Sequence, residues 1–359
     1  MRQGLLNALF PLPRYLKMPS VGLDISDKSI RFIGFKEKKG ALRIDRFAEE
    51  KLPTGIVVRG KIKDPEKMKE ELTRFREAHG LEFVRVSLPE EQAYLFSMRL
   101  PLVKKRELKE SVTLQLEEHV PLKPEDAVFD YEISGERADG YSLGVSVYPR
   151  TVAESYANIF IGSGLIPLSF EIEAEAIARA VVPKGDHSTY MVVDFGQMRT
   201  GISVVSGGAV AFTSTVEIGG AEITEAIAAA LNISRTEAET MKREKGLVRG
   251  EGGKEKAYAS MLSIVAPLRD EINKHYLYWH THQEGETARL PIAKLILCGG
   301  DSNLRGLPEY LSRSMRVPVE LSNVWVNVGR TDEYLPEIAF GDSLTYATAI
   351  GLALADFIE

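Results

Sequence analysis

Alternating apolar and polar positions recur in two separate stretches of the chain, in the same order both times. From Pro19 the chain reads VGLDI, SIRFIGF and ALRIDRFA, joined by short polar turns, and a helical pattern follows at Pro65 to His79. From Tyr190 it reads YMVVDF, TGISVVS and AVAFTST, again with short turns, and then the helical stretch Gly220 to Leu231. Each stretch predicts a strand, a hairpin, a third strand and a helix. The repetition predicts two related α/β lobes.

An aspartate ends the first strand of each predicted unit. Asp24 precedes the strand that opens at Ser29, and Asp194 precedes the strand that opens at Thr200. An aspartate at a strand end is often only a turn former, so the match alone is weak. A third element strengthens it, because IAKLILCGGDSNLRGLPEYLSRSM predicts a buried strand, a Gly-Gly turn and a helix. The three elements in this order favour a duplicated fold over coincidence.

The composition is that of an ordinary folded protein and narrows the classes of partner. Hydrophobic residues make up 44% and charged residues 27% of 359 positions, and the net charge is -6. Because Lys and Arg are interleaved with acids, we expect no nucleic-acid partner. The single cysteine, Cys298, cannot form an internal disulfide, and no Cys/His cluster stands at zinc-ligand spacing. A cytoplasmic location fits this cysteine usage.

Residues 1–20 form a separate N-terminal extension that mixes leucines with Arg2, Arg14 and Lys17. The chain has no run of the roughly 20 apolar residues that cross a bilayer, and the extension lacks a signal-peptide pattern. Pro11 and Pro13 limit any helix here to one or two turns. Peripheral membrane contact is one interpretation of this segment, and packing against the body or disorder is the more ordinary one.

The three repeated elements resemble the phosphate-1, phosphate-2 and adenosine motifs of the actin, Hsp70 and sugar-kinase superfamily. Inside that superfamily the chain resembles the PilM family of type IV pilus proteins, which is similar to the division protein FtsA. The resemblance covers nearly the whole chain from Val21. It rests on VGLDISDKSIRFIGF, VSLPEEQAYLFSMRLP, LQLEEHVPLKPEDAVFDYEI, GSGLIPLSFEIEAEAIARA, VVDFGQMRTGISVVSGG, LILCGGDSNLRGLPEYL and GDSLTYATAIGLAL.

The resemblance implies an α/β protein with an actin-like (ribonuclease H-like) duplicated two-lobe fold and a small α+β subdomain inserted in the first lobe. The implied parts are the extension 1–20, the first lobe 21–88, the inserted subdomain 89–164, a closing helix of the first lobe in 165–188, the second lobe 189–340, and a C-terminal helix in 341–359 that returns to the first lobe. For the insertion the sequence predicts strands at Ala93 to Leu100, Phe129 to Ile133 and Ser142 to Tyr148, and helices at Lys105 to His119 and Val152 to Ser163.

The same resemblance implies ATP and magnesium as cofactors, bound between the lobes. Asp24 and Asp194 match the aspartates that hold a hydrated magnesium ion. The implied phosphate-binding residues are Ser26, Lys28, Ser29, Arg31, Gly196 and Thr200. Those implied on the adenosine side are Gly219, Gly220, Glu239, Lys242, Gly299, Gly300, Asp301 and Asn303.

One of these assignments has an ordinary structural alternative. Glu239 and Lys242 match a pair that brackets adenosine, and their spacing puts both on one helical face, but such a pair is often a surface salt bridge. Glu173 falls where relatives place the residue that orients attacking water, so Glu173 and Asp194 are the catalytic candidates.

The phosphate-1 turn departs from the family pattern, because it contains Asp27 where relatives have small residues. An aspartate facing phosphate would be repulsive. Either Asp27 points to solvent with Lys28 compensating, or the protein binds nucleotide weakly and hydrolyses it slowly.

The function implied by the resemblance is a cytoplasmic ATP-binding scaffold, peripheral at the inner face of the cytoplasmic membrane, in the type IV pilus inner-membrane complex. Its implied partner is the cytoplasmic N-terminal peptide of PilN, held at the inserted subdomain. Tyr94, Phe96, Phe129 and Tyr131 are the aromatic candidates for that partner groove, although they could instead form the subdomain's own core. The alternatives are a phosphotransferase or ATPase of the same superfamily, or a membrane-associated homologue such as FtsA or GspL, the last of which continues into a transmembrane helix.

Overall fold

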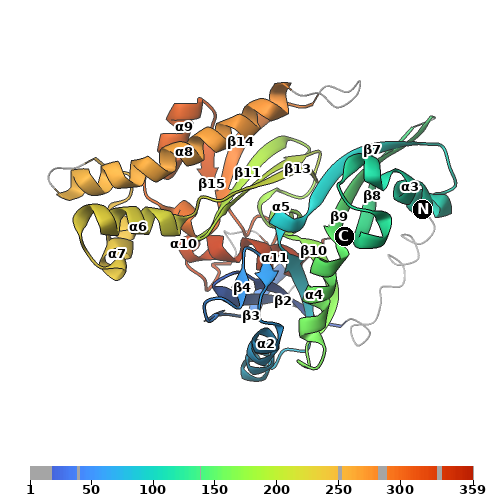
Figure 1. Cartoon of the computed structure of the whole chain (residues 1–359), viewed down its shortest axis with the longest axis horizontal. Coiled ribbons are helices and arrows are strands. Elements are labelled where there is room, and N and C mark those ends of the chain that lie inside the picture. The colour runs from blue at the N-terminus through green and yellow to red at the C-terminus, as the bar shows by residue number, and fades with distance from the viewer. Residues whose placement is uncertain are drawn as a thin grey trace.

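The computed structural model describes residues 18–38, 41–137, 139–249, 253–281, 289–329 and 334–358. Its two main sheets each have five strands (Figure 1). The first has the order β10 (Ile166–Ile172), β6 (Phe83–Leu88), β1 (Ser20–Ile25), β2 (Ser29–Lys38) and β3 (Ala41–Lys51). The second has the order β15 (Val319–Leu321), β14 (Ile292–Cys298), β11 (Thr189–Phe195), β12 (Thr200–Ser206) and β13 (Ala209–Val216).

The two sheets share one topology. In each, three antiparallel strands follow one another along the chain, and two later strands are added in parallel beside the first of them. Asp24 pairs with Arg31 across the first hairpin, and Asp194 pairs with Gly201 across the second. The duplicated strand pattern predicted from the sequence is therefore confirmed.

Amphipathic helices cover the outer face of each sheet. In the first lobe these are α2 (Pro65–His79) and α4 (Arg150–Phe160), and in the second they are α6 (Gly220–Leu231), α8 (Gly253–Thr281) and α9 (Leu307–Met315). Local chemistry sets the bounds of α2, since the Asp64 side chain accepts a 3.1 Å hydrogen bond from the Lys67 N–H and Gly80 ends the helix at a φ of 60°. Both α2 and α6 have the predicted bounds.

Two helices form a layer between the sheets. α5 (Glu173–Val181) and α11 (Ala347–Leu354) share one core with residues from both sheets, including Ile33 of β2 and Val192 of β11. The short helix α10 (Phe340–Ser343) and the turn η6 (Leu344–Tyr346) lead into α11. The two lobes are therefore joined by a continuous apolar layer as well as by the polar site described below.

The inserted segment forms a small sheet with a helix on one face. The strand order is β7 (Tyr94–Pro101), β9 (Gly140–Pro149) and β8 (Ala127–Arg137). The short turns η2 (Glu90–Gln92), η3 (Lys105–Glu107) and η4 (Pro124–Asp126) flank β7 and α3 (Leu108–His119), and α3 shares a separate core with this sheet. The predicted elements are confirmed here, but Ile159 and Phe160 of α4 pack into the core of the first lobe.

Close backbone contact fixes the position of α11. A Cβ added to Gly351 would lie 1.6 Å from the Ala176 carbonyl oxygen of α5, and one added to Gly22 would lie 1.9 Å from the Ala349 carbonyl oxygen. Such distances force the backbones apart. Glycine is therefore required where the central layer meets β1 and α5.

We expect Gly351→Ala to lower the free energy of unfolding by at least about 1–3 kcal/mol, as overpacking does. Urea denaturation measures this change. Gly144→Ala is the matched control, because a Cβ there meets nothing within 4 Å. Equal stability of the two variants would show that α11 can shift without cost.

Candidate functional site

The candidate site lies at the carboxyl ends of the parallel strands, where the two lobes meet. Asp24 lies at the end of β1 and Asp194 at the end of β11. Glu90 follows β6, and Glu173 follows β10 as the first residue of α5. Ligand sites in α/β proteins form at this edge, since side chains that follow neighbouring parallel strands converge there.

The turn between β1 and β2 is closed by its own serines. The Ser26 N–H donates to the Ser29 carbonyl at 2.9 Å, and the Ser26 hydroxyl accepts from the Ser29 N–H at 3.1 Å. Lys28 lies at the tip of this turn, and no described residue forms an ion pair with it. The turn is therefore rigid and carries one unneutralised ammonium group among the residues that the structure describes.

Asp27 does not point to solvent, which corrects the first of the two expectations for it. Its carboxylate is buried and accepts hydrogen bonds from the Arg59 N–H at 2.9 Å and the Gly60 N–H at 3.1 Å. Arg59 and Gly60 form the two-residue turn between β4 (Val57–Val58) and β5 (Lys61–Ile62), with φ of 51° and 67°. Two positive φ values are typical of the type I′ hairpin turn. The hairpin, together with Arg199, compensates Asp27, and Lys28 does not.

Asp24 is held by partners from two neighbouring strands. Its carboxylate accepts a 3.0 Å hydrogen bond from the Ser87 hydroxyl and lies 3.5 Å from Nη1 of Arg31. Arg31 also pairs with Glu49 at 2.9 Å, while its buried Nε has no hydrogen-bond partner. Burial raises the pKa of Asp24, and the Arg31 guanidinium opposes that rise.

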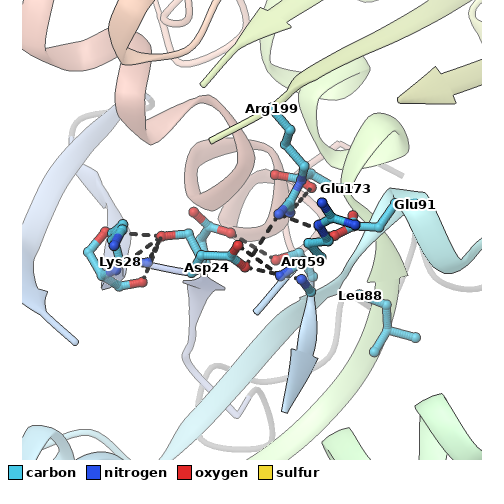
Figure 2. Close-up of polar contacts among 12 residues, drawn as sticks. Asp24, Lys28, Arg59, Leu88, Glu91, Glu173 and Arg199 are labelled. Carbon is cyan, nitrogen blue, oxygen red and sulfur yellow. Dashed lines mark hydrogen bonds and ion pairs between the residues drawn. The ribbon is translucent and has the colours of Figure 1, made fainter. Parts of the chain in front are cut away.

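Arg199, on the turn between β11 and β12, crosses from the second lobe to the first (Figure 2). Its Nη1 lies 3.4 Å from Asp27 Oδ1 and 3.2 Å from Glu91 Oε1, and its Nη2 lies 3.8 Å from Glu173 Oε2. One guanidinium thus contacts the phosphate-1 turn, the η2 turn and the start of α5. Arg31 contacts a different acid of this junction, Asp24.

The inter-lobe acidic cluster carries more acid than its two arginines neutralise. We use this name for the group Asp24, Asp27, Glu90, Glu91, Glu173 and Asp194. Burial raises the pKa of Glu90 and Glu173 well above the usual range, and neighbouring carboxylates raise both further. Burial, followed by the charge of Asp24, raises the pKa of Asp194 to about 6. In addition, Oε1 of Glu90 is buried without a hydrogen-bond partner.

The turn of the second hairpin is fastened to the start of α6. The Gly196 N–H donates to the Arg199 carbonyl at 3.0 Å, and the Gly220 N–H donates to the Gly196 carbonyl at 3.0 Å. The Thr200 hydroxyl donates to the Ile218 carbonyl at 2.6 Å. The hydroxyl predicted to face phosphate therefore serves to hold the turn.

The predicted adenosine pair lies on α7 (Arg235–Lys245) and is not a surface salt bridge. Lys242 is buried, with its Nζ 2.9 Å from Glu239, 2.6 Å from Asp301 and 3.1 Å from the Gly220 carbonyl. Glu239 also accepts a 2.6 Å hydrogen bond from Thr224. The pair joins α7 to the start of α6 and to the Gly-Gly turn.

The Gly-Gly turn after β14 packs directly on Asp194. A Cβ on Gly299, whose φ is 87°, would lie 2.3 Å from Asp194 Oδ1, and one on Gly220 would lie 1.9 Å from the Asp301 side chain. Gly300 begins the turn η5 (Gly300–Asn303), and Asn303 donates to the Gly341 carbonyl. Contacts within the protein therefore explain why glycine is needed at positions 299 and 220. No ligand has to be invoked for this requirement. Gly219 is the neighbour of Gly220.

The predicted partner-groove aromatics share one face of the small sheet. Tyr94 and Phe96 lie opposite Val147 and Val145 of β9, which in turn lie opposite Phe129 and Tyr131. Phe96, Phe129 and Tyr131 pack against the core that includes α3, and Tyr94 remains 36% exposed. Three of the four therefore contribute to the subdomain's own core, while Tyr94 stays accessible, and the assignment of a partner groove to these residues remains a prediction.

Sequence reasoning missed Arg199, Glu90, Glu91 and the Arg59 turn. The acids had a usable signal, since Glu90 and Glu91 come just after the apolar stretch Phe83–Leu88, which forms the parallel strand β6. Arg199 had a weaker one, its place inside the second phosphate turn. Its partners lie in other segments, and Asp27 is 172 positions away along the chain.

Two of the sequence predictions concern membrane contact and metal binding. The possible membrane contact of the N-terminal extension falls on residues 1–17, which lie outside the described residues. Among the described helices, none is long and apolar enough to cross a bilayer. Within the same residues, no group of three or more Asp, Glu, His or Cys side chains is arranged to hold a metal ion directly.

Comparisons with known proteins agree with this architecture. The sequence model of the family "Type IV pilus assembly protein PilM" matches residues 22–357. The structure of a PilM-PilN type IV pilus biogenesis complex is similar over 96% of this chain and 99% of that one, with a TM-score of 0.77 and 20% identity. MreB5 of Spiroplasma citri bound to AMPPNP matches over 92% and 93%, with a TM-score of 0.56 and 13% identity. EutJ of Carboxydothermus hydrogenoformans matches over 98% and 96%, with a TM-score of 0.50 and 18% identity. The predicted actin-like two-lobe fold is confirmed.

Proposed function

Because the chain belongs to the PilM family of type IV pilus assembly proteins, we propose that it is a cytoplasmic ATP-binding scaffold of the pilus inner-membrane complex. It binds ATP with magnesium between its lobes and captures the cytoplasmic N-terminal tail of PilN at the inner face of the membrane. The observation that carries the proposal is the family match over residues 22–357. The solved PilM-PilN complex of the same fold supports the choice of partner.

The residues at the junction of the lobes fit a nucleoside triphosphate. Phosphate binds best to charged nitrogen donors. Arg31 has a buried Nε without a partner, and Lys28 lacks an ion pair among the described residues. Structures of MreB5 in complex with ADP and with AMPPNP support nucleotide binding by this fold.

The carboxylates of the same junction fit a hydrated divalent cation. Asp24 is buried and Asp194 is partly buried beside it, and desolvation raises the pKa of each, with the charge of Asp24 adding to the rise for Asp194. A nearby cation favours the ionised form of both groups. Asp24 and Asp194 would hold the hydrated ion, which would neutralise charge on the phosphates.

The chemistry of Glu173 favours a scaffold over a rapid ATPase. A general base must be ionised to accept a proton from water. Burial raises the pKa of Glu173 well above the usual range, which makes loss of its proton less favourable. No feature of the described residues favours the phosphotransferase alternative.

Partner capture is assigned to the inserted subdomain. Its strands supply no residue to the phosphate or adenosine groups described above. Tyr94 is the predicted groove residue with the most exposed ring. Exposed aromatic rings are favoured at recognition sites because they bury much area at little entropic cost.

We expect ATP with magnesium to raise the thermal midpoint of the wild type and not that of Asp194→Asn. A ligand at a hundred times its Kd stabilises the folded state by about 2.7 kcal/mol. Differential scanning fluorimetry measures the shift. Asp45→Asn, at an exposed position that pairs only with Lys36 among the described residues, is the control and should keep the full shift.

The thermal midpoint of Asp194→Asn without nucleotide shows whether the variant still folds. It therefore separates loss of binding from loss of folding. A carboxyl whose pKa is raised in the folded state destabilises that state above the raised value. The pKa of Asp194 is about 6. At pH 7.5 the neutral amide of Asp194→Asn therefore removes a destabilising charge and should not lower the thermal midpoint for that reason. An ATP-dependent shift of undiminished size in Asp194→Asn would remove Asp194 from the nucleotide site.

We expect Tyr94→Ser to weaken binding of the PilN tail at least about tenfold, as loss of a buried aromatic contact does. Calorimetry with a synthetic tail peptide measures this affinity. Leu114→Ser is the control, because Leu114 is 80% exposed on α3 and lies on another element. Unchanged binding by Tyr94→Ser with weakened binding by Leu114→Ser would place the docking surface on α3 instead.

A further inference from the structure

Arg199 connects the nucleotide turns to the base of the inserted subdomain. The turn that bears it also contains Gly196 and Thr200, which the sequence assigns to the second phosphate motif. Its Nη1 contacts Asp27 in the first phosphate turn and Glu91 in η2. η2 lies between β6 of the first lobe and β7 of the subdomain, so Glu91 stands where the subdomain leaves the lobe.

Glu91 has one ion pair among the described residues, the contact with Arg199. Both carboxylate oxygens are buried and lack a hydrogen-bond partner, and the 3.2 Å ion pair with Arg199 is its one close charge contact among the described residues. Burial raises the pKa of Glu91, and the Arg199 guanidinium is the main opposing influence. A buried carboxylate that loses its cation must take up a proton or move toward water. Either response changes η2.

Phosphate competes for the same guanidinium. A guanidinium has a fixed fork of donors, and phosphate oxygens match that fork at least as well as carboxylates do. The Arg199 guanidinium contacts three carboxylates, with nitrogen–oxygen distances of 3.2 to 3.8 Å. It does not form two short bonds to any of them. A polyphosphate between the two turns can therefore compete with the three carboxylates for the Arg199 guanidinium.

We propose that Arg199 is a positioning residue through which phosphate occupancy between the lobes is transmitted to η2 and the inserted subdomain. This inference rests on the proposed nucleotide binding. Without nucleotide, Arg199 holds Glu91 and fixes the base of the subdomain. With nucleotide, the guanidinium turns to the phosphates and releases Glu91. Coupling of this kind is reciprocal, so a partner that repositions the subdomain also changes nucleotide affinity.

Amide hydrogen exchange of the full chain, followed by mass spectrometry with and without saturating ATP and magnesium, tests the inference. In the wild type we expect ATP to speed exchange in a peptide covering residues 88–96. Glu91→Gln should show the faster exchange already without nucleotide, and ATP should add nothing. Arg199→Gln should lose the ATP-dependent change in the same way.

The variants are chosen so that folding and charge can be separated. Arg199→Lys keeps the charge but not the fork, and should retain the contact without nucleotide while losing part of the ATP response. Arg106→Gln is the control, because Arg106 is 77% exposed on η3 and pairs only with the adjacent Glu107 among the described residues. It should behave as the wild type does.

Two outcomes overturn the inference, and they can be told apart. If the wild type binds ATP but exchange at residues 88–96 does not change, or changes equally in Glu91→Gln, then Arg199 is only a static ion-pair partner. If the wild type gives neither a thermal shift nor any exchange change with ATP, the proposed nucleotide binding fails as well.

Discussion

The arrangement of the two lobes depends on burying many carboxylates around few cations. Asp24, Asp27, Glu90, Glu91, Glu173 and Asp194 meet where the parallel strands end, and Arg31 and Arg199 are the arginines that contact them. Burial raises the pKa of Asp24, Glu90, Glu91, Glu173 and Asp194, and neighbouring carboxylates add to the rise for all but Asp24. The apolar layer of α5 and α11 keeps the lobes together against this cost. A site with excess acid is suited to a cation, which supplies the missing positive charge.

The surrounding architecture serves to hold this cluster in position. The central layer is fixed to β1 and α5 by contacts that tolerate only glycine at 22 and 351. On the second lobe, Lys242 ties α7 to the start of α6 and to the Gly-Gly turn, which packs on Asp194. Several residues that the family resemblance assigns to ligand binding, including Thr200 and Lys242, thus have partners within the protein. In this structure they shape the turns.

The sequence was a good guide to the strands, the helices and the positions of the two hairpin turns, because alternation, capping and turn chemistry act over short distances. It did not reveal the direction of Asp27, since the N–H groups that receive this side chain belong to a hairpin more than thirty positions later, and the positive φ of Arg59 carries no clear sequence signal. Arg199 escaped for the same reason, because its partners come from three other segments. For the four aromatic residues the spacing was informative: Tyr94 and Phe96 are two positions apart, as are Phe129 and Tyr131, and each pair lies on one face of its strand.

Arg199 neutralises Asp27 across the lobe junction, and a double-mutant cycle measures this interaction. The free energy of unfolding is measured by urea denaturation, without nucleotide, for the wild type, Asp27→Asn, Arg199→Gln and the double variant. Residues in contact show coupling energies of about 0.5–3 kcal/mol. We expect a coupling within that range, with the double variant more stable than Arg199→Gln alone because the uncompensated carboxylate is gone. Additive effects of the two substitutions, within about 0.5 kcal/mol, would show that Arg199 does not neutralise Asp27.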